Sequence, residues 1–237
     1  KKICVIGHFA LGEQFLDGQT VKTKIITKEL RKQYGKSEVN IIDTHGGKKT
    51  LLKAPAHCKK ALKNCDNIII FPGENGLRVY APLLAITNKK YHRKLFYVVI
   101  GGWLPEFVKD KKMLSESLKK FDGIFVETKA MQSVMKKIGF TNVKVIPNCK
   151  ELNILDEDDL VYNREGLFSF CTFSRVMKEK GIADAVDAIN EINKKYEKPI
   201  CTLDIYGQVD KNQEEWFGQL QKSFTEEIKY KGVVPFD

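Results

Sequence analysis

The sequence predicts an α/β protein made of two doubly wound parallel units. Up to about residue 147, short apolar runs rich in β-branched residues alternate with amphipathic segments of helical period. The pattern then stops in an acidic stretch without a clear period, and afterwards it starts again. Continuously apolar strands separated by helices are typical of a parallel sheet that is covered on both faces.

The first unit is predicted to span residues 1–150. Strands are expected near residues 3–7, 39–43, 67–71, 95–100, 123–127 and 144–147. Helices are expected near residues 19–34, 51–63, 77–88, 113–121 and 130–138. Each strand except the last is followed by one helix, which is the repeating element of a doubly wound sheet.

Residues 151–165 are predicted to be a linker, because they are acidic and lack a period. The second unit, residues 166–237, contains three candidate strands and two candidate helices. The strands lie near residues 167–173, 200–206 and 227–231, and the helices near 182–196 and 214–224. Three strands are too few for a complete doubly wound domain, so we expect this second unit to be incomplete.

Composition indicates a soluble, globular, cytoplasmic protein. Hydrophobic residues make up 43% of the chain, and no apolar run approaches the roughly 20 residues that span a bilayer. The six cysteines form no C-x-x-C pair, so we expect reduced core residues and neither a zinc site nor disulfides. The four histidines are isolated in the sequence and are interpreted as structural.

The net charge of +10 suits an anionic partner. The basic residues are spread over helix patterns such as 22–32 and 109–120, as on solvated helix faces. No nucleic-acid-binding module accompanies them, so a nucleic-acid partner is not expected. The charge also allows weak, peripheral association with the inner face of a membrane.

Residues 168–189 contain a strand, a short basic turn and an amphipathic helix. Arg175 ends the strand, and Lys180 precedes the helix. A helix N-terminus carries unpaired N–H groups and a partial positive charge, so two nearby cations can hold a phosphate with it. The alternative is that Arg175 and Lys180 are simply solvated.

The turn after the first strand has glycines at Gly7, Gly12 and Gly18. This spacing is not the G-x-G-x-x-G fingerprint, which argues against a nicotinamide dehydrogenase. Gly18, at the start of the first helix, would let an anion approach the backbone. The alternative is an ordinary helix N-cap by Asp17 or Thr20.

Two further loops follow central strands, at the edge where open α/β sheets bind ligands. Glu74 and Asn75 follow the third strand and could face an acceptor sugar, although a plain turn with an N-cap explains Gly73 and Asn75 equally well. Gly101, Gly102 and Trp103 follow the fourth strand and could form a platform for a sugar. The alternative for Trp103 is a packed side chain.

The basic turn resembles the "GR…EKG" segment of glycosyltransferase family 4, a retaining family with the GT-B fold. Segments 123–139, 142–148, 203–207 and 230–235 resemble further motifs of this family, in the same order. The resemblance implies one complete Rossmann-like domain and part of a second. It also implies transfer of a sugar from a nucleotide-sugar donor to a glycan, lipid-linked or similar acceptor, with retained configuration and without a cofactor or metal.

By this resemblance, Arg175 and Lys180 hold the donor diphosphate, with the backbone near Gly18 opposite, and the acceptor rests on the first domain. Gly101 and Gly102 stand where many relatives have a histidine. The acidic segment that contacts the donor sugar is expected beyond Asp237, so no catalytic residue is assigned and this stretch is expected to lack part of the catalytic site. A GT-B nucleotide-sugar epimerase and a noncatalytic nucleotide-sugar-binding module remain alternatives.

Overall fold

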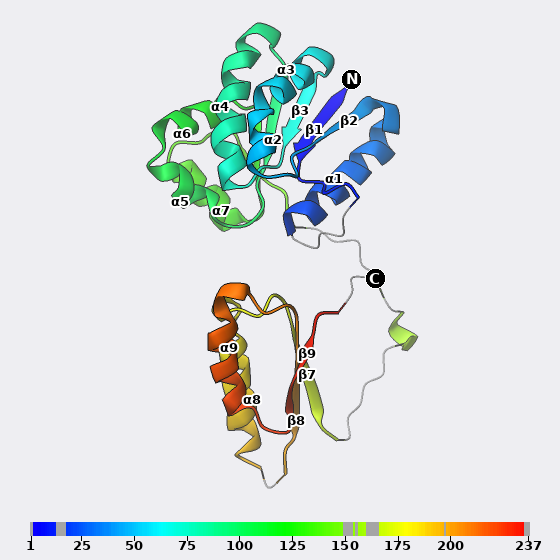
Figure 1. The fold of residues 1–237 in the computed structure, drawn as a ribbon, viewed down its shortest axis with the longest axis vertical. Coiled ribbons are helices and arrows are strands. Elements are labelled where there is room, and N and C mark those ends of the chain that lie inside the picture. Colours follow the sequence, from blue (N-terminus) through cyan, green and yellow to red (C-terminus); the bar gives the residue numbers. More distant parts are fainter. Residues whose placement is uncertain are drawn as a thin grey trace. The chain divides into compact units, whose positions relative to one another are not determined.

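The computed structural model describes residues 2–12, 18–148, 154, 156–159, 166–196 and 198–234. The chain divides into two compact units, Lys1–Asn153 (unit 1) and Ile154–Asp237 (unit 2). Figure 1 shows helices packed on a parallel sheet in each unit. Most of the predicted linker 151–165 lies outside the described residues.

Unit 1 contains a six-stranded parallel sheet in the order β2-β1-β3-β4-β5-β6. The strands are β1 (Ile3–Gly7), β2 (Val39–Asp43), β3 (Asn67–Ile70), β4 (Lys94–Val98), β5 (Gly123–Val126) and β6 (Val143–Val145). All six strands predicted for this unit are confirmed. Their apolar side chains divide between two cores, one on each face of the sheet.

Seven helices of unit 1 are described: α1 (Gly18–Tyr34), α2 (Lys48–Leu52), α3 (Ala54–Asn64), α4 (Glu74–Tyr91), α5 (Leu104–Lys109), α6 (Lys112–Leu118) and α7 (Lys129–Lys137). Helix α1 packs on one face through Ile26 and Leu30, whereas α3 to α7 supply the larger core on the other. The helix predicted at 51–63 is divided at Lys53, because Pro55 occupies the first turn of a new helix. Pro105 likewise starts α5, which was not predicted.

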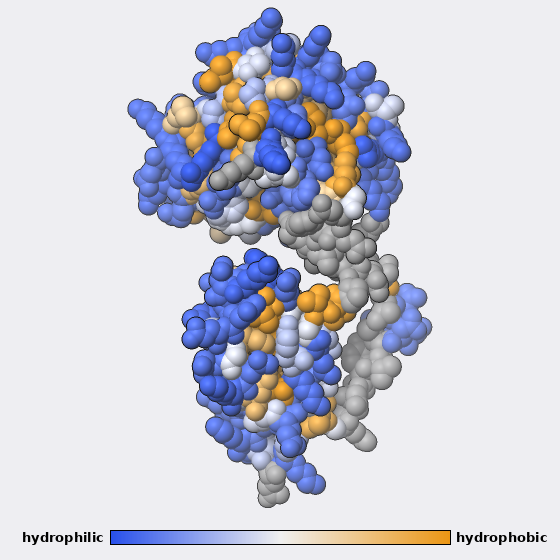
Figure 2. Space-filling view, viewed as in Figure 1, coloured by the Kyte–Doolittle hydropathy of each residue, from blue (hydrophilic) through white to orange (hydrophobic). Residues whose placement is uncertain are grey.

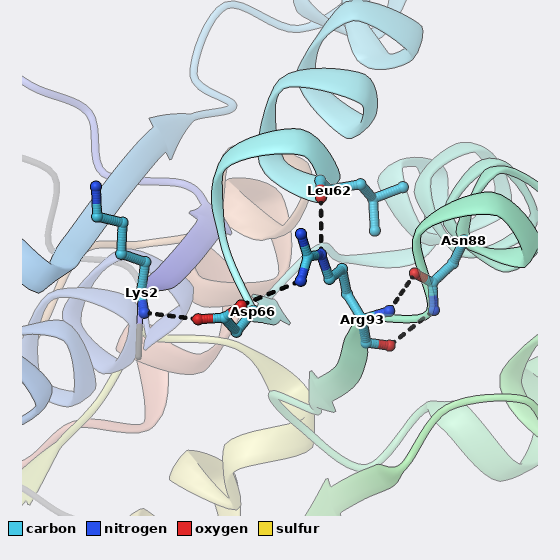
Figure 3. Close-up of polar contacts among 5 residues, drawn as sticks. All are labelled: Lys2, Leu62, Asp66, Asn88 and Arg93. Atoms are coloured by element: carbon cyan, nitrogen blue, oxygen red, sulfur yellow. Dashed lines mark hydrogen bonds and ion pairs between the residues drawn. The ribbon is translucent and has the colours of Figure 1, made fainter.

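The amino-terminal edge of this sheet is held by a polar network (Figure 3). The Asp66 carboxylate accepts hydrogen bonds from the backbone N–H of Lys2 and the guanidinium of Arg93, each at 3.1 Å. Arg93 also donates to the carbonyl of Leu62 at 3.2 Å, and Asn88 bonds both backbone groups of Arg93. These contacts fix the loops that enter β3 and β4.

Unit 2 contains a three-stranded parallel sheet in the order β7-β8-β9. Its elements are β7 (Phe168–Phe173), α8 (Ile182–Asn193), β8 (Cys201–Tyr206), α9 (Glu214–Leu220) and β9 (Ile228–Gly232). Both helices lie on one side of the sheet (Figure 1), and their apolar residues pack on Leu203 and Ile205 of the central strand. On the face shown in Figure 2, apolar atoms run down unit 2 between its hydrophilic borders.

The elements predicted for unit 2 are all present, with both helices shorter than expected. Helix α8 ends at Asn193, and α9 ends at Leu220, where a 3-10 turn (η5, Gln221–Ser223) follows it. In the part of the chain that the structure describes, no helix combines the length and apolar character needed to cross a membrane.

Candidate functional site

In unit 2, the turns after β7 and β8 lie side by side. The carbonyl of Gln208 accepts a hydrogen bond from the N–H of Val176 at 2.9 Å, and Asp210 donates its N–H to the carbonyl of Val176 at 3.1 Å. Gly207 has φ +133°, and a Cβ at this position would lie 1.7 Å from the carbonyl oxygen of Ser174. This close approach brings the residues after both strands to one edge of the sheet.

Arg175 lies in this paired turn and is 3.6 Å from the carboxylate of Asp210. The Arg175 side chain is 68% exposed, so the ion pair leaves most of the guanidinium accessible. An open hollow of about 290 Å³ is lined by Arg175, Gln208, Val209, Asp210 and Lys211. We call it the Arg175 hollow. Asp210 was not predicted, because its contact with Arg175 depends on strand pairing.

Lys180 lies on the same connection, in a 3-10 turn (η3, Lys178–Lys180) that passes through Gly181 into α8. Its side chain is exposed, and within the described ranges it has no carboxylate at ion-pair distance. Gly181 has φ +70°, a left-handed conformation that suits glycine between the turn and the helix. The predicted cations therefore stand at the two ends of one loop, and direct contact of either with a ligand stays a prediction.

In unit 1, the first turns of α1 contact the carboxyl ends of the strands. Helix α1 begins at Gly18, and Asp17, the alternative N-cap, lies outside the described residues. Gln19 donates its side-chain amide to the carbonyl of Phe71 at 2.9 Å. The Thr20 hydroxyl is 2.6 Å from Nδ1 of His8. Gly18 therefore lies near the carboxyl ends of these strands, and its contact with an anion stays a prediction.

Three of the histidines, although isolated in the sequence, have side-chain partners in the structure. Nδ1 of His45 is 2.9 Å from Nε2 of His8, and the two rings meet edge to face. The pair forms because β1 and β2 are parallel neighbours whose carboxyl ends meet, although the residues are 37 positions apart. Nδ1 of His57 is 2.9 Å from the hydroxyl of Tyr80.

Asp43, the last residue of β2, supports the loops that carry these histidines. Its carboxylate accepts backbone hydrogen bonds from Phe9 and His45 at 2.9 Å and from Leu11 at 3.1 Å. Burial by itself would raise the pKa of Asp43, but these N–H donors, together with that of Ala10, lower the pKa below its ordinary value of 3.8.

Asp43→Asn is expected to lower the stability of unit 1 by about 1 kcal/mol at neutral pH, a figure reduced for the partial exposure of the carboxylate. Because the pKa of Asp43 is depressed in the folded state, this contribution to stability is present above pH 3.8. It is lost as the pH falls through the pKa that Asp43 has in the folded protein. Urea unfolding at several pH values tests this, with the exposed Asp110→Asn as control. A difference that persists unchanged in acid would contradict the role of the charge.

The helix pattern predicted that Lys22 lies on a solvated face. The structure shows instead that Lys22 is buried. Its side chain is 2% exposed, and its ammonium is 2.7 Å from the carboxylate of Glu127 and 3.3 Å from the carbonyl of Val99. Val99 and Glu127 directly follow β4 and β5. An acidic residue at the end of a continuously apolar strand is a sequence signal for Glu127, but its pairing with Lys22 depends on the fold.

The predicted acceptor-side residues lie at the same edge. Helix α4 starts at Glu74 after Gly73, and no side chain caps it, so Glu74 and Asn75 are exposed in its first turn. The Trp103 indole donates to the carbonyl of Ile100 at 2.8 Å. If Gly101 carried a side chain, its Cβ would lie 3.4 Å from the Trp103 indole, which would be the nearest group.

Trp103 is therefore partly packed, as its alternative interpretation held. Its ring meets that of Phe107 at a centroid distance of 5.1 Å and an angle of 89°. Nothing within 4 Å would meet a Cβ on Gly102, so the backbone there is open to a ligand. The predicted contact of these residues with an acceptor stays a prediction.

Comparison with known proteins shows the fold. No family model and no curated protein matches the sequence. Among solved structures, HepE of Anabaena, in complex with UDP and glucose, aligns with a TM-score of 0.63 and 17% identity, over 98% of this chain and 69% of that one. The fold is of the GT-B type.

Two other similar structures agree with it. OtsA aligns with a TM-score of 0.62 and 12% identity, over 100% of this chain and 74% of its own. The lipopolysaccharide outer core galactosyltransferase WaaB aligns with a TM-score of 0.58 and 12% identity, over 99% of this chain and 68% of its own. The parallel sheet with helices in each unit is consistent with the Rossmann-like domains of the GT-B fold.

Proposed function

We propose that the protein is a nucleotide-sugar glycosyltransferase of the retaining kind found in family 4, acting on a glycan, lipid-linked or similar acceptor. One observation carries the proposal: the Arg175 hollow lies beyond the carboxyl ends of two parallel strands, and Arg175 belongs to the connection that leads through Lys180 into the twelve-residue helix α8. The GT-B fold supports it, and so does the UDP held by HepE.

The chemistry of sugar transfer matches this edge. When the bond to the sugar breaks, negative charge grows on the departing nucleoside diphosphate. Fixed cations and helix N–H groups stabilise that charge more strongly in the transition state than in the bound donor. Arg175 and Lys180 are assigned to the diphosphate, and the backbone at Gly18 to its other side.

The acceptor is assigned to unit 1. Glu74, Asn75, Gly102 and the exposed part of Trp103 offer it polar and aromatic contacts at one edge of the sheet. In this proposal residues 1–150 form the acceptor-side domain, residues 151–165 the linker, and residues 166–237 belong to the donor-binding domain. The resemblance to family 4 supports retention of configuration.

Arg175→Ala is expected to weaken the binding of UDP at least tenfold, because a charge-assisted contact to phosphate contributes roughly 1.5–3 kcal/mol. Isothermal titration calorimetry with UDP, GDP and ADP measures the change for whichever nucleotide binds. Lys194→Ala, at the other end of α8, removes the same charge from an exposed site and serves as the control.

Asp210→Asn provides the opposite test. Asp210 attracts Arg175 and would repel a phosphate, so its neutral variant is expected to bind the nucleotide severalfold more tightly. The side chain of Asp210 also accepts a hydrogen bond from the N–H of Asn212 at 3.1 Å, which the asparagine oxygen can still accept. Unchanged affinity in both Arg175→Ala and Asp210→Asn would overturn the diphosphate assignment.

Turnover separates the proposed activity from its alternatives. A transferase releases nucleoside diphosphate from a nucleotide sugar only when an acceptor is supplied. Release without an acceptor, together with a changed sugar configuration, would indicate an epimerase. Binding without release by the complete protein would indicate a noncatalytic module.

A further inference from the structure

A second hollow lies on unit 1, between helices α4 and α6. Its volume is about 380 Å³, and it is open to solvent. It is lined by Arg78, Pro82, Lys111, Lys112, Met113 and Leu114. We call it the Phe107 hollow, because the ring of Phe107 is contacted by two of its cations.

The cations of the Phe107 hollow have acidic neighbours one helical turn away, Glu74 before Arg78 and Glu116 after Lys112, but form no ion pair with them. The guanidinium of Arg78 is 4.9 Å from the Phe107 ring centroid, and the ammonium of Lys111 is 4.2 Å from it. Throughout the described part of the chain, no carboxylate forms an ion pair with Arg78, Lys111 or Lys112. Two cations that contact one ring repel each other, and a bound anion would relieve that repulsion.

The rest of the lining is apolar. Pro82 and Leu114 are buried beneath the hollow, whereas the Met113 side chain is 73% exposed at its rim. The exposed Met113 side chain is apolar, so an apolar group of a ligand that packs against it would remove apolar surface from water on both sides. That burial would favour binding. The hollow therefore offers two kinds of contact at once, cationic and apolar.

The Phe107 hollow adjoins the acceptor-side edge. Arg78 lies one turn after Glu74 on α4. Phe107 lies one turn after Trp103, and the backbone N–H of Phe107 donates to the carbonyl of Trp103 at 3.2 Å. The Trp103 and Phe107 rings touch edge to face. A ligand in the hollow would thus have its further parts near Glu74 and Trp103.

We propose that the Phe107 hollow binds the phosphate group of an amphiphile, with Arg78, Lys111 and Lys112 around the phosphate and Met113 against the apolar chain. Phosphate suits this set because its oxygens can accept from several cations together. If the proposed sugar transfer is correct, the amphiphile is the acceptor, a lipid-linked phosphate. Binding itself does not depend on that activity.

The test uses the whole chain and two sources of the same chemistry. Hexyl phosphate is titrated by calorimetry, with inorganic phosphate for comparison, and vesicle cosedimentation uses phosphatidylcholine alone or mixed with phosphatidic acid. Arg78→Gln/Lys111→Gln is expected to weaken hexyl phosphate binding at least tenfold. Lys136→Gln/Lys137→Gln on α7 removes two exposed charges elsewhere and is expected to bind normally.

Each outcome decides the proposal. Binding of hexyl phosphate with or without vesicle binding supports the site, and the vesicle result tells whether the phosphate can lie in a bilayer. If both double variants lose the same affinity for hexyl phosphate, the attraction is generally electrostatic and the proposed site is overturned. Equal affinity for inorganic and hexyl phosphate would also overturn it, and so would the absence of binding to any probe. UDP binding, measured in parallel, is expected to be unchanged in Arg78→Gln/Lys111→Gln, which separates this inference from the proposed function.

Discussion

Gly207→Ala is expected to destabilise unit 2 by about 3 kcal/mol. The added Cβ would lie 1.7 Å from the carbonyl oxygen of Ser174, a distance at which the backbone must move. The residue also has φ +133°, which L-amino acids rarely adopt. Separating the turns after β7 and β8 would break the hydrogen bonds between Val176 and its partners in the second turn.

The two tryptophans allow each unit to be followed separately, since Trp103 is in unit 1 and Trp216 in unit 2. In a Trp103→Phe background, fluorescence during urea unfolding reports on unit 2. Gly218→Ala is the matched control, because it lies in α9 and nothing within 4 Å would meet its Cβ. Alanine should stabilise that helix slightly. Equal stability of the two variants would refute the close-approach argument.

The same substitution tests whether the turn shapes the proposed nucleotide site. Arg175 follows Ser174, so a displaced Ser174 carbonyl moves the guanidinium out of the Arg175 hollow. UDP affinity is therefore expected to fall in Gly207→Ala, at a temperature where the variant is still folded, and to stay normal in Gly218→Ala.

The elements of this fold could be predicted because their signals are local. The run Ile68–Phe71 is apolar on both faces and is followed by Pro72 and Gly73, which predicts a buried strand and its end. Helix ends were less predictable. Lys53 divides one expected helix into two, and only the position of Pro55, at the start of α3, indicates why.

The polar partners could not be predicted, since they depend on which strand ends meet. His8 and His45 are 37 residues apart, and Lys22 and Glu127 are 105 apart. Only the parallel register places them at one edge. Arg175 and Lys180 could be proposed from the sequence because strand, turn and helix are consecutive, whereas Asp210 lies in the turn after the next strand.

Breaking the ion pair between Lys22 and Glu127 is expected to have the largest effect on unit 1. The Lys22 side chain is 2% exposed and that of Glu127 18%. Glu127→Leu leaves an ammonium buried without its partner and should cost about 3–5 kcal/mol. Lys22→Met leaves the more exposed carboxylate, which water can still reach, and should therefore cost less.

The double variant Lys22→Met/Glu127→Leu is expected to be more stable than Glu127→Leu alone, because a well-packed apolar pair leaves no buried charge. Unfolding followed by Trp103 in a Trp216→Phe background gives the coupling energy of the complete cycle. The exposed pair of Lys119 and Glu116, at 3.0 Å, is the control and should show little coupling. If the two single variants lower the free energy of unfolding by the same amount, and the double variant lowers it by their sum, then the buried Lys22 ammonium does not need the Glu127 carboxylate.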